Sequence, residues 1–340
     1  MLKGPTVLIL GAGSSVDFGL PVGSTLADDI RREVDISIDD DLSILRGSEE
    51  IAESFLVDFE HAESELYFDA GRRLASALPN FSSIDDALFT HSHDDRIRLI
   101  GKAAIARIIS KYERASFVNG LWSRESGIQD RALREIEASW AQTLIRILVT
   151  RVRYEDRLSV LEKLTIITFN YDRCIESILF HSLQKAFSMG AEDATEAMSR
   201  LKVFRPYGGL GVLPYSDGVE RAVPFGTDVG WIQLAANISV YTDDLGERPD
   251  LVEMRAKLEE AASAVFLGFA FHPQNVQTLS VRPANAVATF GTATRESDPR
   301  RQGFIRSARS IFDNKTDPRI ILPNFDCKAL LEQYGAELGD

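Results

Sequence analysis

The feature that most constrains the fold is an apolar run that passes directly into a glycine-rich turn near the N-terminus. Residues 5–10 read PTVLIL, the composition of a buried strand, and GAGSS follows at 11–15. Glycine has no Cβ, so the backbone of such a turn can approach a phosphate group closely. The unit predicts the first strand of a doubly wound α/β fold and its phosphate site. A tight turn without a ligand is the alternative, because Val16 replaces the third glycine of the G-x-G-x-x-G pattern.

The residues after this turn predict a helix. Ser24 is a suitable N-cap for residues 25–32, and Asp28 and Asp29 lie in the first turns. A helix that began at the glycine turn would add the positive end of its dipole to the phosphate site.

Composition narrows the class of protein. A chain of 340 residues with 44% hydrophobic residues can hold about two domains, or one core domain with a large insertion. The net charge of −13 argues against direct nucleic-acid binding. The two cysteines, Cys174 and Cys327, exclude a four-cysteine zinc site and suit a reducing compartment. No apolar run reaches about 18 residues. We therefore expect a cytoplasmic protein without metal or membrane contact.

The pattern along the chain predicts one α/β domain with a helical interruption. Apolar residues at helical spacing dominate 35–154, and strand-like runs resume at 164–169. Further strands are expected at 202–205, 264–268, 286–290 and 319–322, helices at 172–189, 275–281 and 298–313, and a long loop at 206–230. The predicted fold is a Rossmann-like doubly wound parallel sheet (1–34 and 155–340) with an all-helical insertion at 35–154.

Two polar side chains follow the second predicted strand. Asn170 and Asp172 come directly after an apolar run, at the strand end where open α/β sheets bind ligands. The alternative is structural, with Asp172 capping the next helix and Asn170 satisfying a turn. Spacing alone leaves both interpretations open.

Four motifs in this order resemble the sirtuin-like family. They are GAGSS with Gly19-Leu20-Pro21, TFNYD at 168–172, FLGFA at 266–270 and FGT at 290–292. The chain is most similar to the bacterial NAD-hydrolysing branch, whose members act in anti-phage defence. The protein-deacylating branch carries a four-cysteine zinc module, which two cysteines cannot supply. It also carries an aromatic-arginine segment after the proline, where this chain has Val22-Gly23.

The resemblance implies an NAD site, with NAD as the substrate. The glycine turn would hold the phosphates, Asn170 and Asp172 would lie beside the nicotinamide ribose, and Gly268 and Phe269 would lie on the adenosine side. Taken without the family, Gly268 is a tight turn and Phe269 a core residue. The implied binding residues are Gly11, Ala12, Gly13, Ser14, Pro21, Thr168, Asn170, Gly268, Phe269 and Thr292, and the implied catalytic positions are Asn170, Asp172 and Tyr207.

Tyr207 is the sharpest departure from the family. It occupies the place of the catalytic histidine, in the segment VFRPYGGLG at 203–211. An imidazole with a pKa near ~6.5 accepts a proton at neutral pH, whereas a phenol near ~10 does not. We expect bound NAD but greatly reduced hydrolysis. An engineered inactive form and a natural pseudoenzyme are both compatible with this residue, and His272 is the histidine we would test as a substitute.

Two functions of different class follow. The first is hydrolysis of NAD to ADP-ribose and nicotinamide, impaired by Tyr207. The second is a catalytically silent subunit that binds NAD or ADP-ribose. A dehydrogenase fits less well, because residues 30–45 show no second strand to carry a ribose-binding acid. The resemblance also implies a homo-oligomer and a partner chain, such as a HerA-type DNA-translocating ATPase or a short Argonaute.

Overall fold

The fold is built around a parallel β-sheet. A computed structural model describes residues 1–339 apart from 40, 42, 216–221, 229, 240–247, 295 and 314–319. The five strands are β1 (Thr6–Leu10), β4 (Leu164–Thr168), β5 (Lys202–Phe204), β6 (Ser263–Leu267) and β7 (Ala288–Gly291). Their order is β5-β4-β1-β6-β7, and each neighbouring pair is parallel. Both β4 and β6 pair with β1, so the order reverses there, as in Rossmann-like folds.

Both faces of the sheet are covered, which explains why its strands read as continuous apolar runs. Val7 and Ile9 of β1 belong to one hydrophobic core, and Leu8 and Leu10 belong to a second core on the other face. Successive strand residues point to opposite faces, so each face receives alternate side chains. The first core includes side chains of α11 (Pro249–Glu259), α12 (Pro273–Leu279) and α13 (Asp298–Ile311). The second includes those of α7 (Trp140–Val149), α8 (Cys174–Phe187) and α14 (Cys327–Leu338).

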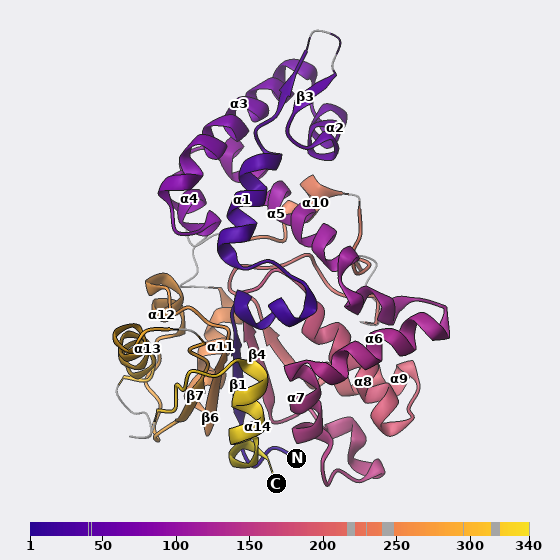
Figure 1. The fold of residues 1–340 in the computed structure, drawn as a ribbon, viewed down its shortest axis with the longest axis vertical. Helices are drawn as coiled ribbons and strands as arrows, with labels where there is room; N and C mark the ends of the chain where they lie inside the picture. The colour runs from indigo at the N-terminus through magenta and orange to yellow at the C-terminus, as the bar shows by residue number, and fades with distance from the viewer. Residues whose placement is uncertain are drawn as a thin grey trace.

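A second group of helices lies above the carboxyl ends of the strands (Figure 1). It consists of α1 (Gly23–Glu33), α2 (Glu49–Asp58), α3 (His61–Ala77), α4 (Ile84–Thr90), α5 (Asp95–Ala115) and α10 (Trp231–Ala235). The remaining helices, α6 (Ser126–Ala138) and α9 (Ala191–Ser199), lie on the α8 side of the sheet. Among the described residues, no helix has the length and apolar composition that crossing a bilayer requires.

The predicted α/β class with a parallel sheet is confirmed, and several details differ. The last predicted strand, 319–322, contributes one bridge from Ile321 to Phe290, and Arg319 lies outside the described residues. The cap of α1 is Val22, not Ser24, which is exposed in the first turn. The predicted all-helical segment also contains an antiparallel hairpin, β2 (Ser37–Ile38) with β3 (Ile44–Arg46).

Packing also crosses the predicted boundaries at 35 and 154. Helices α6 and α7 come from the predicted insertion, yet Ile136 and Trp140 belong to the same core as Leu8 of β1. Conversely, α1 and α10 come from the predicted sheet domain and contact α5. The division of the chain into those two domains therefore stays a prediction.

A buried ion pair joins the helical group to the start of α8. Glu113 of α5 and Arg173 are 0% and 1% exposed, and the guanidinium contacts both carboxylate oxygens, at 2.6 and 3.1 Å. Glu113 also accepts from the backbone N–H of Arg173 and of Gly226. Burial raises the pKa of Glu113, and the charge of Arg173 opposes this. The pair fixes the residue next to Asp172 against the longest helix.

Removing one partner of this pair should be strongly destabilising. Glu113→Gln leaves the guanidinium buried without its counter-charge, so we expect the free energy of unfolding in urea to fall by about 3–5 kcal/mol. Glu155→Gln is the matched control, because Glu155 pairs with Arg153 at 3.6 Å on the surface. In this control the free energy of unfolding should fall by less than about 1 kcal/mol. Equal losses for the two variants would contradict this role of the pair.

Candidate functional site

Three glycines bring the loops after β1 and β6 into direct backbone contact. A Cβ on Gly11 would lie 2.5 Å from the Gly268 carbonyl oxygen, and one on Gly13 would lie 2.9 Å from the Gly268 Cα. Gly268 has a φ of +58°, and a Cβ there would overlap the backbone of Gly13 and Ser14. Only glycine fits all three positions. The two loops therefore meet at the point where the strand order reverses.

This contact uses backbone groups that the predicted phosphate site needed. The amides of Gly11 and Gly13 donate to the carbonyls of Leu267 and Gly268, at 3.0 and 3.1 Å. The amide of Ser14 donates to Gly11 at 2.9 Å. The loop continues as two short 3-10 turns, and α1 begins only at Gly23. The helix dipole is thus not at the turn, and phosphate binding by residues 11–14 stays a prediction.

Asn170 is held beneath this turn by its side-chain nitrogen. The Nδ2 atom is 3.1 Å from the Gly11 carbonyl, 3.3 Å from the Ser14 hydroxyl and 2.9 Å from the Ser15 hydroxyl. A carbonyl only accepts, so the amide nitrogen must face Gly11. The side-chain oxygen Oδ1 is buried and has no hydrogen-bond partner among the described residues. A buried acceptor without a partner is unfavourable, which suggests that a ligand or water completes it.

Asp172 is bound on both carboxylate oxygens. Oδ2 accepts from the Ser15 hydroxyl at 2.8 Å, and Oδ1 accepts from the Cys174 N–H at 3.1 Å in the first turn of α8. Asp172 is not the N-cap that the structural alternative expected, because the N-cap residue of α8 is Arg173, and this contact comes from the residue before it. Asn170, Ser15 and Asp172 thus form one hydrogen-bonded row. Burial and the charge of Asp172 raise the pKa of the Cys174 thiol well above its usual range, so Cys174 is no thiolate nucleophile.

Tyr207 is buried at the end of β5. Its ring packs edge to face on Phe169, with centroids 5.5 Å apart. Its hydroxyl donates to the Asn275 side-chain oxygen at 2.6 Å. The residue in the predicted histidine position is therefore a well-packed hydrogen-bond donor to α12.

Most of the other predicted site residues support the loops. The Thr168 hydroxyl accepts from the Asn170 N–H at 3.1 Å, and the Thr292 hydroxyl accepts from the Gly268 N–H at 2.8 Å. Phe269 is a core residue whose ring centroid lies 5.3 Å from that of Phe169. Pro21 and Ala12 are half-buried.

Residues that the sequence interpretation missed also hold the site. Trp140 of α7 donates from its indole nitrogen to the Ser14 carbonyl at 2.7 Å. Ser15 joins Asn170 to Asp172 through its hydroxyl. In the sequence, only its position beside Ser14 in the glycine turn pointed to this role. Tyr171 donates to Asp85 of α4 at 2.5 Å, and burial raises the pKa of Asp85. These partners are too distant in sequence for spacing to predict them.

Among the described residues, no hydrogen bond joins a histidine side chain to one of the predicted site residues. His272 is exposed and is the N-cap residue of α12. His181 lies in α8, where burial lowers its pKa to about 4, so it is neutral at pH 7. In the part of the chain that the structure describes, no group of three His, Cys, Asp or Glu side chains could hold a metal ion.

Comparison with family models and with curated protein sequences finds no match for this chain. The resemblance to sirtuin-like proteins rests on the four sequence motifs alone. The structure adds that all four meet at one edge of the sheet, because Thr292 of the fourth motif accepts from the Gly268 N–H.

The central glycine contact gives a direct test. In Gly268→Ala, a left-handed backbone and an overlap with Ser14 should together lower the free energy of unfolding by about 2–4 kcal/mol. The control is Gly127→Ala on α6, where a Cβ meets open space. Gly127→Ala should change the free energy of unfolding by no more than about 1 kcal/mol. Unfolding in urea measures both, and a Gly268→Ala protein as stable as the wild type would refute the contact.

Proposed function

We propose that this chain binds NAD at the edge of the sheet where Asn170 lies under the glycine turn. The observation that carries the proposal is the buried Oδ1 of Asn170, which has no partner among the described residues. A ribose hydroxyl or a water molecule can donate to this oxygen. The sirtuin-like motifs favour NAD over other nucleotides, and the reversal of strand order at β1 is where nucleotides bind in such sheets.

The proposed reaction is hydrolysis of the bond between nicotinamide and ribose. A water oxygen bonds to ribose C1′, the C1′–N bond breaks, and nicotinamide leaves as a neutral molecule with the bonding electrons. The water passes its proton to the group at position 207 when that group is histidine, and otherwise to solvent. Asn170 would orient the water or the ribose hydroxyls through Oδ1. Asp172 would act mainly as a positioning residue, because both of its oxygens already accept hydrogen bonds. Its negative charge would still favour the cationic ribose in the transition state.

The group at position 207 decides between catalysis and binding alone. The Tyr207 hydroxyl donates to Asn275, so in this arrangement it holds a proton where the reaction needs a proton acceptor. This contact favours the second candidate, a silent subunit that holds NAD or ADP-ribose.

The role in anti-phage defence, the homo-oligomer and the partner chain belong to the proposal and are supported by the motifs only.

Restoring histidine separates these possibilities. We expect the wild type to bind NAD with little turnover, and Tyr207→His to release nicotinamide about 10²–10⁴-fold faster, because imidazole accepts the proton. Calorimetry measures NAD binding, and chromatography measures nicotinamide. Failure of both forms to bind NAD would overturn the proposal, and binding without turnover in Tyr207→His would establish the silent subunit.

Asn170→Ala tests the residue that carries the proposal. Loss of a hydrogen bond to the ligand costs about 1–3 kcal/mol, so NAD affinity should fall by about tenfold or more. Asn80→Ala is the matched control, since Asn80 is exposed and donates to the nearby Ala77 carbonyl. Its affinity for NAD should equal that of the wild type.

A further inference from the structure

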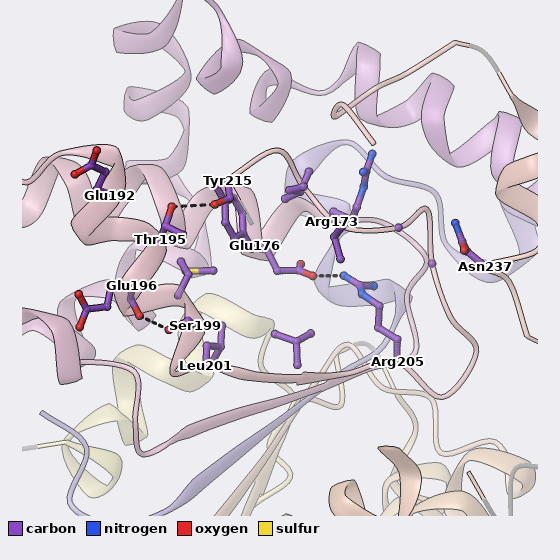
Figure 2. Close-up of a pocket in the computed structure, with 16 residues that line it drawn as sticks. Arg173, Glu176, Glu192, Thr195, Glu196, Ser199, Leu201, Arg205, Tyr215 and Asn237 are labelled. Carbon is purple, nitrogen blue, oxygen red and sulfur yellow. Dashed lines mark hydrogen bonds and ion pairs between the residues drawn. The ribbon is translucent and has the colours of Figure 1, made fainter. Parts of the chain in front are cut away.

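A cavity of about 1010 Å³ opens beside the edge strand β5, and none of the predicted nucleotide-site residues lines it. Its walls are α8, α9, β5 and the loop 209–215 (Figure 2). This volume is at the upper end of the range that small-molecule sites occupy in proteins. The cavity is therefore large enough for a ligand of its own.

Glu176 of α8 gives this cavity an unsatisfied acceptor. Its side chain is 10% exposed, and Oε1 accepts from Arg205 at 2.5 Å. Figure 2 shows the carboxylate reaching from α8 towards Arg205 among the lining residues. Its other oxygen, Oε2, is buried and has no partner among the described residues. A buried carboxylate oxygen without a donor is costly, so a ligand N–H would be bound favourably.

The charges around the cavity favour a cation. Two arginines line it, but each already faces acceptors: Arg173 pairs with Glu113, and Arg205 binds Glu176 and, at 2.7 Å, the Asn170 carbonyl. Glu192 and Glu196 lie on the exposed side of α9, and the Glu196 carboxylate already binds Arg200 at 3.0 Å. An anionic ligand would meet only paired arginines among those that line the cavity, and it would face the Glu192 carboxylate and the unpaired Oε2 of Glu176.

The rest of the lining is apolar and aromatic. Met198, Leu201, Val203 and Leu213 provide aliphatic surface. The ring of Tyr215 also lines the cavity and stacks on Phe180, with centroids 4.6 Å apart. Aromatic faces attract organic cations.

We propose that this cavity binds a small organic cation, an alkylammonium or alkylguanidinium group whose N–H donates to Glu176 while its apolar body packs on the aliphatic wall. The proposal does not depend on NAD binding. A guanidinium is planar and carries several N–H donors, which suits a buried carboxylate oxygen.

Butylguanidinium and butylurea form a matched pair of probes, because they share size and shape and differ in charge. Calorimetry with the full chain should show binding of butylguanidinium that weakens with added salt, and no binding of butylurea. Glu176→Gln should weaken the binding at least about tenfold. Glu260→Gln is the control and should bind like the wild type, because Glu260 is exposed at the end of α11 and does not line the cavity.

A second variant keeps the test valid if Glu176→Gln does not fold. Ser199 is exposed at the end of α9 and lines the cavity, so Ser199→Trp should block entry without breaking a buried contact. We expect it to abolish binding and keep the wild-type unfolding transition. No binding to the wild type, equal binding of butylurea, or binding unchanged in Ser199→Trp would each overturn the proposal.

Discussion

The contact between two loop backbones, at Gly13 and Gly268, is the constraint on which the site depends. The two backbones lie so close that neither position has room for a Cβ atom. The contact thereby fixes the carboxyl ends of β1 and β6 against each other. Ser14 and Ser15 are thereby placed over the end of β4, where their hydroxyls meet Asn170. A side chain at any of the three glycines would push this arrangement apart.

Contacts from the helical group and from α7, which covers one face of the sheet, converge on the same edge. Glu113 of α5 binds Arg173, Asp85 of α4 accepts from Tyr171, and Trp140 of α7 donates to Ser14. Each contact reaches a residue of the 170–173 segment or of the glycine turn. The helices above the sheet therefore do more than cover it, because they determine where Asn170 and its neighbours lie. Arg205 extends this network to the cavity beside β5, since it binds both the Asn170 carbonyl and Glu176.

The sequence predicted the parts of the fold that local pattern determines. The apolar runs at 6–10 and 164–168 became paired strands, and Asn170 and Asp172 were correctly placed after the second of them. The start of α1 was predicted at the wrong residue, because Ser24 looks like a cap although Val22 is the residue that precedes the helix. Ser15 and Asp172 are 157 residues apart, and only the pairing of β1 with β4 brings them together. Spacing carries no information about such a contact, nor about the glycines packing on Gly268.

If the buried Asn170 oxygen faces a ribose-containing nucleotide, a crystal structure of the chain with ADP-ribose will show the contact. We expect ligand density at the edge formed by the glycine turn and the 268–269 loop, with a ribose hydroxyl or a ligand-bound water donating to Asn170 Oδ1. Ligand bound elsewhere, or an Asn170 oxygen satisfied by a protein group with this edge closed, would contradict it.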